Sequence, residues 1–526
     1  MRGRIGRVQG TVGGPGRAGE RPGPPRGWSK APSPALDGSA VAALLLLIVA
    51  ILASSLSFAG NARASASPDP GTHGGPASAV LDPSFGQGGL VHIPVPGIAS
   101  LSPLPAFRTP VSGVSVGDGS LVVRGGPSLE LLSSSGGSGE LFGGSVDLPV
   151  PAGSQQEYVL AGFTVDPQGR LVVVRTSYFP EAENPSPLDL DAAVFRPAAI
   201  QISRLLPDGS PDPGFGQGGV VETDLGLPAP LATDRRGRVG SRPALRATGI
   251  TIDPQGRLVV TGEAAIGLRL GCHFGEELRP SVDSGGFVAR FEEDGSLDTT
   301  FGGRGVIGGR RLAELPLYPE SVREPVADGS GITYRSATSR ECSAGRSRNG
   351  IAQLAQTGKA RGAFGDGGGI EGPFTALAGG PAGSVFALRY IRGIRGEKEK
   401  AKVLKVAPDG KPSRSWGQGG SATIRTGRVV SGGFDSLAVD HRGRLLVGGS
   451  FGPLRARSMA LMRLSALGVQ EKHFGPRGEL VTPVPGLGGR GALFFDPQGR
   501  LISVHAQTGA PDVPAGVVVA RYLLSN

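Results

Sequence analysis

The sequence predicts an all-β fold, a seven-bladed β-propeller with four-stranded antiparallel blades, and three observations predict it. The phrase Asp-Pro-Gln-Gly-Arg-Leu-(Val/Ile) occurs at Asp166–Val172, Asp253–Val259 and Asp496–Ile502. A second phrase, Phe-Gly-x-Gly-Gly, alternates with the first along the chain. The last repeat stops one strand short, whereas the first Phe-Gly phrase has no hairpin before it. Repeats of this size are typical of supersecondary units that pack against their neighbours.

Degenerate copies bring both phrases to seven. Copies of the Asp phrase begin at or span Gly117–Leu121, Asp166, Asp253, Ala327–Ile332, Gly380–Val385, Asp440 and Asp496. Copies of the Phe-Gly phrase begin at Phe85, Phe142, Phe215, Phe301, Phe364, Trp416 and Phe474. Because the two phrases alternate in register, each unit contains one of each. Trp416 stands where other copies have Phe, so we expect it to be a core residue.

Each Asp phrase predicts a hairpin. Apolar residues alternate before the turn, as at Ile250 and Ile252, and β-branched residues follow it, as in Leu258–Val260. In the turn, Pro presets φ, Asp bonds its own backbone and Gly accepts positive φ. A third strand ends at a polar turn, best seen in Phe287–Gly295, and the Phe-Gly phrase then opens a fourth. Four strands per unit match a propeller blade.

The chain ends predict how the ring closes. The last repeat ends after its third strand, Val517–Tyr522, and Phe85–Ile93 is a spare fourth strand. The N-terminal strand therefore completes the last blade, which leaves no unpaired edge at the seam. A six- or eight-bladed ring is the alternative, because the first and fourth copies are degenerate.

The segments FVARFEEDGSLDTTFGGRG at Phe287–Gly305 and GITIDPQGRLVVTGEA at Gly249–Ala264 resemble the Delta-60 repeat, a bacterial β-propeller repeat family. The resemblance extends over about Leu81 to Asn526. It implies a propeller in an exported repeat protein and no agreed activity, so it assigns no catalytic residue.

Composition argues against nucleic-acid binding. Gly (90) and Pro (45) exceed a quarter of the 526 residues, but the glycines fall at repeat positions. The formal charge is +10, yet eight basic and two acidic residues precede Ser65. The remaining 46 basic and 42 acidic residues are interspersed, without the basic stripe that nucleic-acid binding favours.

The N-terminal region predicts export. Residues 1–38 form an Arg/Gly/Pro-rich disordered leader, 39–64 a signal peptide or membrane anchor, 65–80 a linker and 81–526 the propeller. A basic region, the apolar stretch Ala40–Ala53 and Ala62–Ala64 are typical of a secretory signal. An uncleaved anchor is the alternative, because the apolar stretch continues to Ala59 and about 20 residues span a bilayer. In both cases the propeller lies outside the cytoplasmic membrane, secreted or tethered.

Two cysteines, Cys272 and Cys342, fall in second-to-third-strand loops of adjacent blades. In an oxidising compartment they form a disulfide or remain two free thiols, and both alternatives are open. Zinc lacks a fourth ligand at suitable spacing. We therefore expect no metal and no cofactor.

A nucleophile-elbow pattern, Gly448-Gly449-Ser450-Phe451-Gly452, lacks the strand-to-helix turn that its chemistry requires, because Pro453 follows. We therefore assign no catalytic residue.

Two of the longest inserts, Arg175–Pro197 and Glu263–Ser284, connect a second strand to a third strand, and Ser336–Asn349 is a shorter insert of this kind. A further long insert, Glu222–Arg246, links two blades. Both kinds of connection emerge on one face of a propeller, so we expect a recognition surface on blades two to four. Neutral drift is the alternative, since loop insertions cost little. The candidate contact residues are Tyr178, Phe179, Arg235, Arg236, Arg238 and Arg242, with the arginines suited to an acidic partner such as a phosphate-bearing envelope polymer.

The sequence therefore favours a monomeric, non-enzymatic binding or scaffold module at the cell envelope, whose partner is an envelope protein or polymer. The alternative is a lyase or hydrolase with a site at the mouth of the central channel. Convergent carboxylates, His or Tyr at that mouth would favour catalysis.

Overall fold

The computed structural model describes residues 79–95, 111–126, 128–144, 146–149, 156–178, 195–196, 198–227, 242–274, 277–309, 314–337, 348–391, 400–426, 432–452, 457–484, 486–507 and 515–525. The leader, the signal or anchor segment and nearly all of the linker lie outside these residues. Within the described part, no helix is long and apolar enough to cross a membrane.

All but two of the described strands form seven antiparallel blades, numbered in chain order. Blade 1 contains β3 (Val111–Ser115), β4 (Leu121–Gly125) and β5 (Ser128–Leu132). Blade 2 contains β6 (Glu157–Val165), β7 (Leu171–Tyr178), β9 (Ala198–Leu205) and β10 (Val220–Thr223). Blade 3 contains β12 (Leu245–Ile252), β13 (Leu258–Phe274), β14 (Glu277–Phe291) and β15 (Val306–Gly308). Blade 4 contains β16 (Ser321–Asp328), β17 (Gly331–Ala337), β18 (Gly350–Leu354) and β19 (Gly369–Glu371).

Blade 5 contains β20 (Phe374–Gly379), β21 (Val385–Ile391), β22 (Lys400–Val406) and β23 (Ser421–Arg425). Blade 6 contains β24 (Gly432–Val439), β25 (Leu445–Phe451), β26 (Ser458–Leu464) and β27 (Leu480–Pro483). Blade 7 contains β28 (Leu487–Phe495), β29 (Leu501–Gln507), β30 (Gly516–Leu524), β1 (Ala79–Leu81) and β2 (Leu90–Pro94). In blade 1, the described residues hold three strands, and the Phe142 copy of the Phe-Gly phrase forms the 3-10 turn η2 (Leu141–Gly144).

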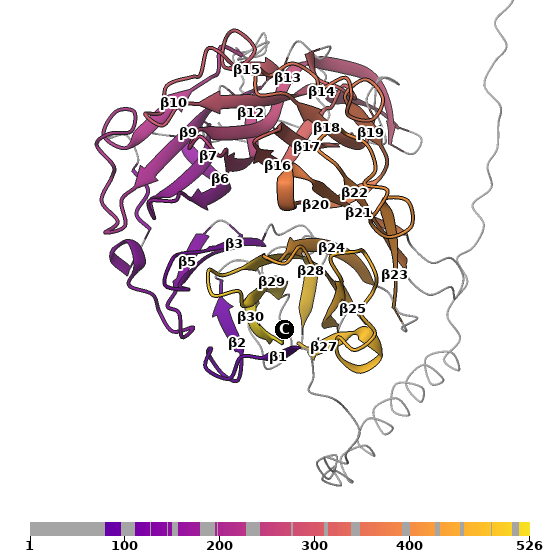
Figure 1. Ribbon diagram of the computed structural model, residues 1–526. Coiled ribbons are helices and arrows are strands. Elements are labelled where there is room, and N and C mark those ends of the chain that lie inside the picture. The colour runs from indigo at the N-terminus through magenta and orange to yellow at the C-terminus, as the bar shows by residue number, and fades with distance from the viewer. Residues whose placement is uncertain are drawn as a thin grey trace, which may run out of the picture. The chain divides into compact units, whose positions relative to one another are not determined.

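The first strand of each blade contacts the first strand of the next, and these contacts close a ring from β3 through β6, β12, β16, β20, β24 and β28 back to β3. Figure 1 shows the blades in this order. The seven-bladed prediction is therefore confirmed. The predicted closure is confirmed as well, because β2 pairs with β30 from Leu90↔Ala520 to Pro94↔Gly516. β1 also pairs with β30, along its other half.

The hydrophobic core is divided among the seven junctions between blades, and each buried cluster joins two neighbours. One cluster packs Val172 and Ile202 of blade 2 against Val260 and Phe287 of blade 3. The corresponding clusters join blades 5 and 6, 6 and 7, 7 and 1, 3 and 4, 1 and 2, and 4 and 5. Trp416 lies in one of them at 2% exposure, as predicted.

Glu263–Ser284 is not a loop, contrary to the sequence prediction. Most of it belongs to a ribbon in which β13 and β14 continue to pair as far as Phe274↔Glu277, well beyond the last pair of β13 with β12, Leu245↔Ala264. The two halves of this segment follow one another along the chain, so a second strand is available within hairpin reach. Pairing therefore satisfies backbone groups that an irregular loop would leave to water. Cys272 accordingly lies in a strand, not in a loop.

Candidate functional site

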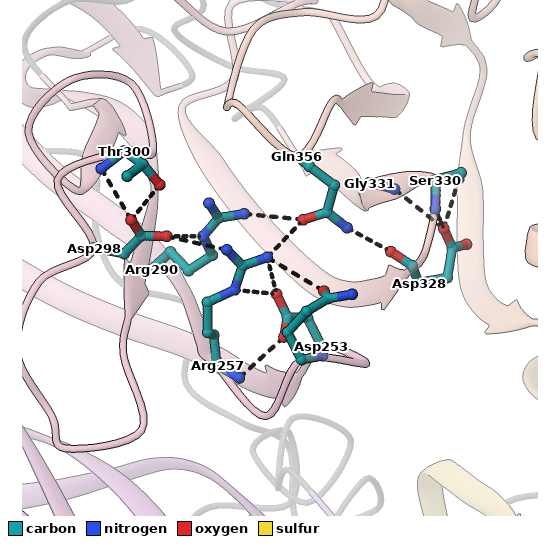
Figure 2. Close-up of polar contacts among 10 residues, drawn as sticks. Asp253, Arg257, Arg290, Asp298, Thr300, Asp328, Ser330, Gly331 and Gln356 are labelled. Carbon is teal, nitrogen blue, oxygen red and sulfur yellow. Dashed lines mark hydrogen bonds and ion pairs between the residues drawn. The ribbon is translucent and has the colours of Figure 1, made fainter.

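A network of charged side chains joins blades 3 and 4 at the face that carries the hairpin turns (Figure 2). Arg290, on the third strand of blade 3, donates from Nε to Asp298 Oδ2 at 2.6 Å. Its guanidinium carbon lies 4.6 Å from the centre of the Phe301 ring. Arg290 Nη1 and Arg257 Nη2 both donate to Gln356 Oε1 of blade 4, at 3.0 and 2.9 Å. The polar contacts thus join one blade to the next.

The Asp of the hairpin phrase holds its own turn and its own arginine. Asp253 Oδ1 accepts from the backbone N–H of Gln255 and Arg257, and Asp253 Oδ2 accepts from Arg257 Nε at 2.8 Å. This confirms the predicted turn chemistry. The same Asp–Arg pair occurs at Asp166–Arg170, Asp440–Arg444 and Asp496–Arg500.

The third-strand cation recurs too. It stacks on an aromatic ring in the pairs Arg204–Phe215, Arg290–Phe301, Lys405–Phe386, Arg463–Phe474 and Arg521–Phe85. Burial raises the pKa of Asp298, but hydrogen bonds from Thr300 and Arg290 outweigh it and hold that pKa below the usual range. With each buried charge compensated inside the protein, this network is structural rather than catalytic.

A second set of inter-blade contacts lies at β-bulges in the first strands. Pairing of the first and second strands shifts register at Leu160/Gly162, Ala247/Gly249, Arg323/Val326, Phe374/Ala376, Phe434/Ser436 and Leu487/Gly491. Thr248 Oγ1 in one bulge donates to the Val322 carbonyl of the next blade, and the Gly491 N–H donates to Asp435 Oδ2 at 3.2 Å. β-Bulges often redirect side chains next to functional sites. Here these two bulges also supply hydrogen bonds between neighbouring blades.

An arginine-rich cluster spans the first strands of blades 3 and 4, near the end where the inserts emerge. Arg246 pairs with Glu263 at 3.1 Å, and Arg335 pairs with Glu324 at 2.5 Å. Arg323 lies between these pairs. Burial lowers the pKa of Arg323, Glu263 opposes that shift, and Arg335 and Arg246 add to it. Three arginines against two glutamates leave one net positive charge, which suits an anionic group.

The sequence analysis missed Arg323, Glu324 and Arg335. The sequence signal for them is weak, because they flank the degenerate fourth copy of the hairpin phrase, Ala327–Ile332, and belong to neither repeated phrase. Glu324 also has a positive φ of 51°, which is a strained backbone conformation. The side chain of the same residue forms the ion pair with Arg335.

Four of the predicted contact residues, Phe179, Arg235, Arg236 and Arg238, lie outside the described residues, as does Cys342. The backbone of Tyr178 ends β7. Arg242 belongs to β11 (Arg242–Pro243), and Cys272 belongs to β13. β11 pairs in parallel with β8 (Phe195–Arg196). The structure therefore joins the insert within blade 2 to the connection between blades 2 and 3. The two alternatives for the cysteines remain open.

The described residues offer no assembled catalytic centre. Ser450 is buried within β25 rather than at the strand-to-helix turn that the elbow pattern requires. Ser503 Oγ lies 2.9 Å from His505 Nε2, but both residues are buried at 0% and 1% exposure, out of reach of a substrate. Within the described part, no group of three His, Cys, Asp or Glu residues is placed to hold a metal ion.

Two pockets with fully described linings lie at blade edges. One, of about 850 Å³, lies along β19 of blade 4 beside Tyr318, Arg348 and Asp366. The other, of about 540 Å³, lies along β10 of blade 2 beside Pro149 and Gln217.

Among the comparisons with known proteins, one short family match agrees with the propeller architecture. A family model described as a domain of unknown function (DUF5122), a β-propeller, matches residues 283–301. No curated protein matches.

Among solved structures, a putative gluconolactonase is 12% identical, with 78% of this chain and 87% of that chain covered and a TM-score of 0.26. An endo-arabinase from Bacteroides thetaiotaomicron is 10% identical, with 73% and 99% covered and a TM-score of 0.27. A polysaccharide lyase is 11% identical, with 72% and 94% covered and a TM-score of 0.25. At these scores none of the three carries an argument about this chain.

Proposed function

We propose that this chain is an exported, non-enzymatic binding or scaffold module of the cell envelope, built from Delta-60-type repeats. It binds an anionic protein or polymer through the elaborated face, defined as the side of blades 2 to 4 where β8, β11 and the β13–β14 ribbon emerge. The observation that carries the proposal is the organisation of these inserts. Blade 2's insert pairs with the following connection through β8 and β11, and blade 3's insert forms a paired ribbon. Drift in loop length does not by itself require such pairing.

Charge favours an acidic partner. The cluster of Arg246, Arg323 and Arg335 lies at the base of the ribbon, and its two glutamates neutralise only part of its charge. The sequence adds Arg235, Arg236 and Arg238 to the neighbouring connection. Guanidinium groups bind phosphate and carboxylate with paired hydrogen bonds, so a phosphate-bearing envelope polymer suits this face.

The test is titration of the full chain with a glycerol-phosphate polymer, with a neutral dextran of similar length as the control ligand. Replacing Arg235, Arg236 and Arg238 together by Gln should weaken phosphate-polymer binding about tenfold or more. A matched variant replaces three exposed cations of blades 5 and 6, Arg414, Arg442 and Lys472, by Gln and should bind normally. Equal binding by both variants would contradict the proposal.

The same titration addresses the lyase or hydrolase alternative, which predicts that the polymer shortens with time. No described contact favours that alternative at present. On the first strands, Glu324 is paired with Arg335 and Asp435 accepts the Gly491 N–H, so both carboxylates have structural partners.

A further inference from the structure

The two edge pockets are built from equivalent parts of the repeat. In each, the Gly-x-Gly of the Phe-Gly phrase and the start of the fourth strand form one wall, Gly216–Gly218 with β10 in blade 2 and Gly365–Gly367 with β19 in blade 4. The connection entering the blade forms the other wall, through Pro149 in blade 2 and Pro316–Tyr318 in blade 4. Features that differ between the pockets are therefore not required by the fold.

Asp366 is such a difference. It occupies the variable position of the Phe-Gly phrase, where the other copies carry Gln87, Gly144, Gln217, Gly303, Gln418 and Pro476. The turn therefore forms without an acid. Among the described residues, the Asp366 carboxylate makes no hydrogen bond, and it acts only at longer range on Arg348, whose pKa is raised by Glu371 first and by Asp366 less. Its charge is thus available to a ligand.

Tyr318 is the second difference, an exposed aromatic ring on an anchored backbone. Leu317 and Tyr318 have positive φ values of 67° and 48°, a conformation that costs about 1–3 kcal/mol per residue outside glycine. Hydrogen bonds to the flanking carbonyls hold this turn, from the Arg348 N–H to Leu317 at 3.0 Å and from the Gly286 N–H to Pro319 at 2.7 Å. Tyr318 as a whole remains 41% exposed at the pocket.

The pocket lining carries a net charge of −2, since Asp366, Glu371 and Glu314 face one cation, Arg348. Arg348 is ion-paired with Glu371. Glu314 accepts from the Gly308 N–H at 3.0 Å and from Arg304 at 3.2 Å. Of these three carboxylates, Asp366 alone has no short-range partner among the described residues. An aromatic face beside a carboxylate is a favourable environment for an organic cation.

We propose that the blade 4 pocket binds a protonated primary amine, with Asp366 as its ion-pair partner and the Tyr318 ring against its alkyl or ammonium part. Three glycines, Gly365, Gly367 and Gly369, keep the floor free of side chains. The amine belongs to a free polyamine or to a lysine side chain of a peptide, and the ammonium chemistry is the same. This site is lined by other residues than the arginines of the first proposal and has the opposite charge preference, so the two proposals fail independently.

The test is calorimetric titration of the full chain with 1,5-diaminopentane, with 1,5-pentanediol as the neutral isostere. We expect the diamine to bind and the diol not to bind. The proposal would be overturned if the diol bound as well as the diamine. It would also be overturned if neither the diamine nor a glycyl-lysyl-glycine peptide bound. Preference for the tripeptide over the diamine would identify a peptide as the source of the amine, and the reverse a free polyamine.

Variants supply the second arm. Asp366→Gln introduces the residue that three other copies carry, so folding should be preserved while diamine affinity falls about tenfold or more. Tyr318→Asn keeps a residue that tolerates positive φ but removes the ring, and should weaken binding severalfold. The matched control is Asp409→Asn, which removes one exposed carboxylate from a turn of blade 5 and should leave binding unchanged. Unchanged binding by Asp366→Gln would contradict the proposal, whereas phosphate-polymer binding should be the same in all three variants.

Discussion

His505 lies inside blade 7, and its burial makes the stability of the fold depend on pH through this one side chain. Burial lowers the pKa of His505 to about 4, and its Nδ1 has no hydrogen-bond partner among the described residues. The unfolded chain takes up the proton near pH 6.5, whereas the folded chain resists it until about pH 4. The contribution of His505 to the free energy of unfolding should therefore be constant above pH 6.5 and fall as pH decreases from 6.5 to 4, by roughly 3 kcal/mol in total.

Urea unfolding of the wild type and of His505→Gln at pH 7.5, 6 and 5 measures this dependence. The variant should lose most of the slope between pH 6.5 and 5, where few carboxylates titrate. His441→Gln removes an exposed histidine and should keep the wild-type slope. A slope unaffected by His505→Gln would show that this side chain does not determine the acid sensitivity.

Arg290 illustrates a buried charge whose removal leaves another charge alone. Arg290→Met should lower the free energy of unfolding by about 3–5 kcal/mol, because Asp298 stays buried at 1% exposure without its main counter-ion. Arg304→Met removes a partly exposed ion pair with Glu314 at 3.2 Å and should cost less than about 1 kcal/mol. Urea unfolding at pH 7.5 compares the two. Similar losses would mean that Arg290 contributes through packing alone.

At the scale of elements, the Phe-Gly phrase of one blade docks on the third-to-fourth-strand turn of the next. The phrase N–H groups donate across the junction in the pairs Gly86–Ser135, Phe142–Pro207, Gly216–Asp294, Gly302–Thr357, Gly365–Gly410 and Gly417–Leu467. This contact explains why each unit carries both a polar turn after its third strand and a Phe-Gly phrase. Each turn needs a glycine where the neighbouring blade approaches.

Gly410 and Gly256 separate the effect of docking from the effect of backbone conformation. Their φ values are similar, 80° and 83°, but a Cβ on Gly410 would lie 2.0 Å from Phe364 Cα, whereas Gly256 faces open space. Gly256→Ala should cost about 1–2 kcal/mol, the price of a left-handed alanine. Gly410→Ala should cost at least about 1–3 kcal/mol more, because the junction of blades 4 and 5 must open. Equal midpoints in urea unfolding would exclude a tight junction at this position.

The sequence predicted what local chemistry determines and missed what the neighbouring blade determines. The Asp253 turn, the strand order and the closing strand follow from residue types and spacing, and the structure bears them out. The partner of Arg290 across the blade junction does not, because Gln356 lies 66 residues away and is not part of either phrase. The ribbon was missed because Glu263–Ser284 lacks a turn signal as strong as Asp-Pro-Gln-Gly. Tyr318 and Asp366 escaped notice because only the fold brings them to one pocket.

At the scale of the molecule, the ring depends on a strand that comes from the other end of the chain. Arg521 of β30 donates from Nε to Asp82 Oδ2 at 2.8 Å and stacks on Phe85 at 4.4 Å. The backbone N–H of Arg521 donates to the Gly89 carbonyl at 3.0 Å. Residues 79–95 therefore supply the counter-ion, the aromatic surface and the strand partners that blade 7 lacks.

A chain that begins at residue 96 should lose cooperative unfolding or aggregate, because β30 becomes an open edge and Arg521 a buried, unpaired cation. A chain that begins at Gly75 keeps β1 and β2 and should unfold with the same urea midpoint as the full chain. Circular dichroism with size-exclusion chromatography distinguishes these outcomes. Adding a synthetic peptide of residues 75–95 to the shorter chain should restore the cooperative transition, and the same peptide with Asp82→Asn should restore it less completely. If the shorter chain remains monomeric and unfolds cooperatively without the peptide, the six blades and the remaining three strands of blade 7 hold the ring by their junctions alone.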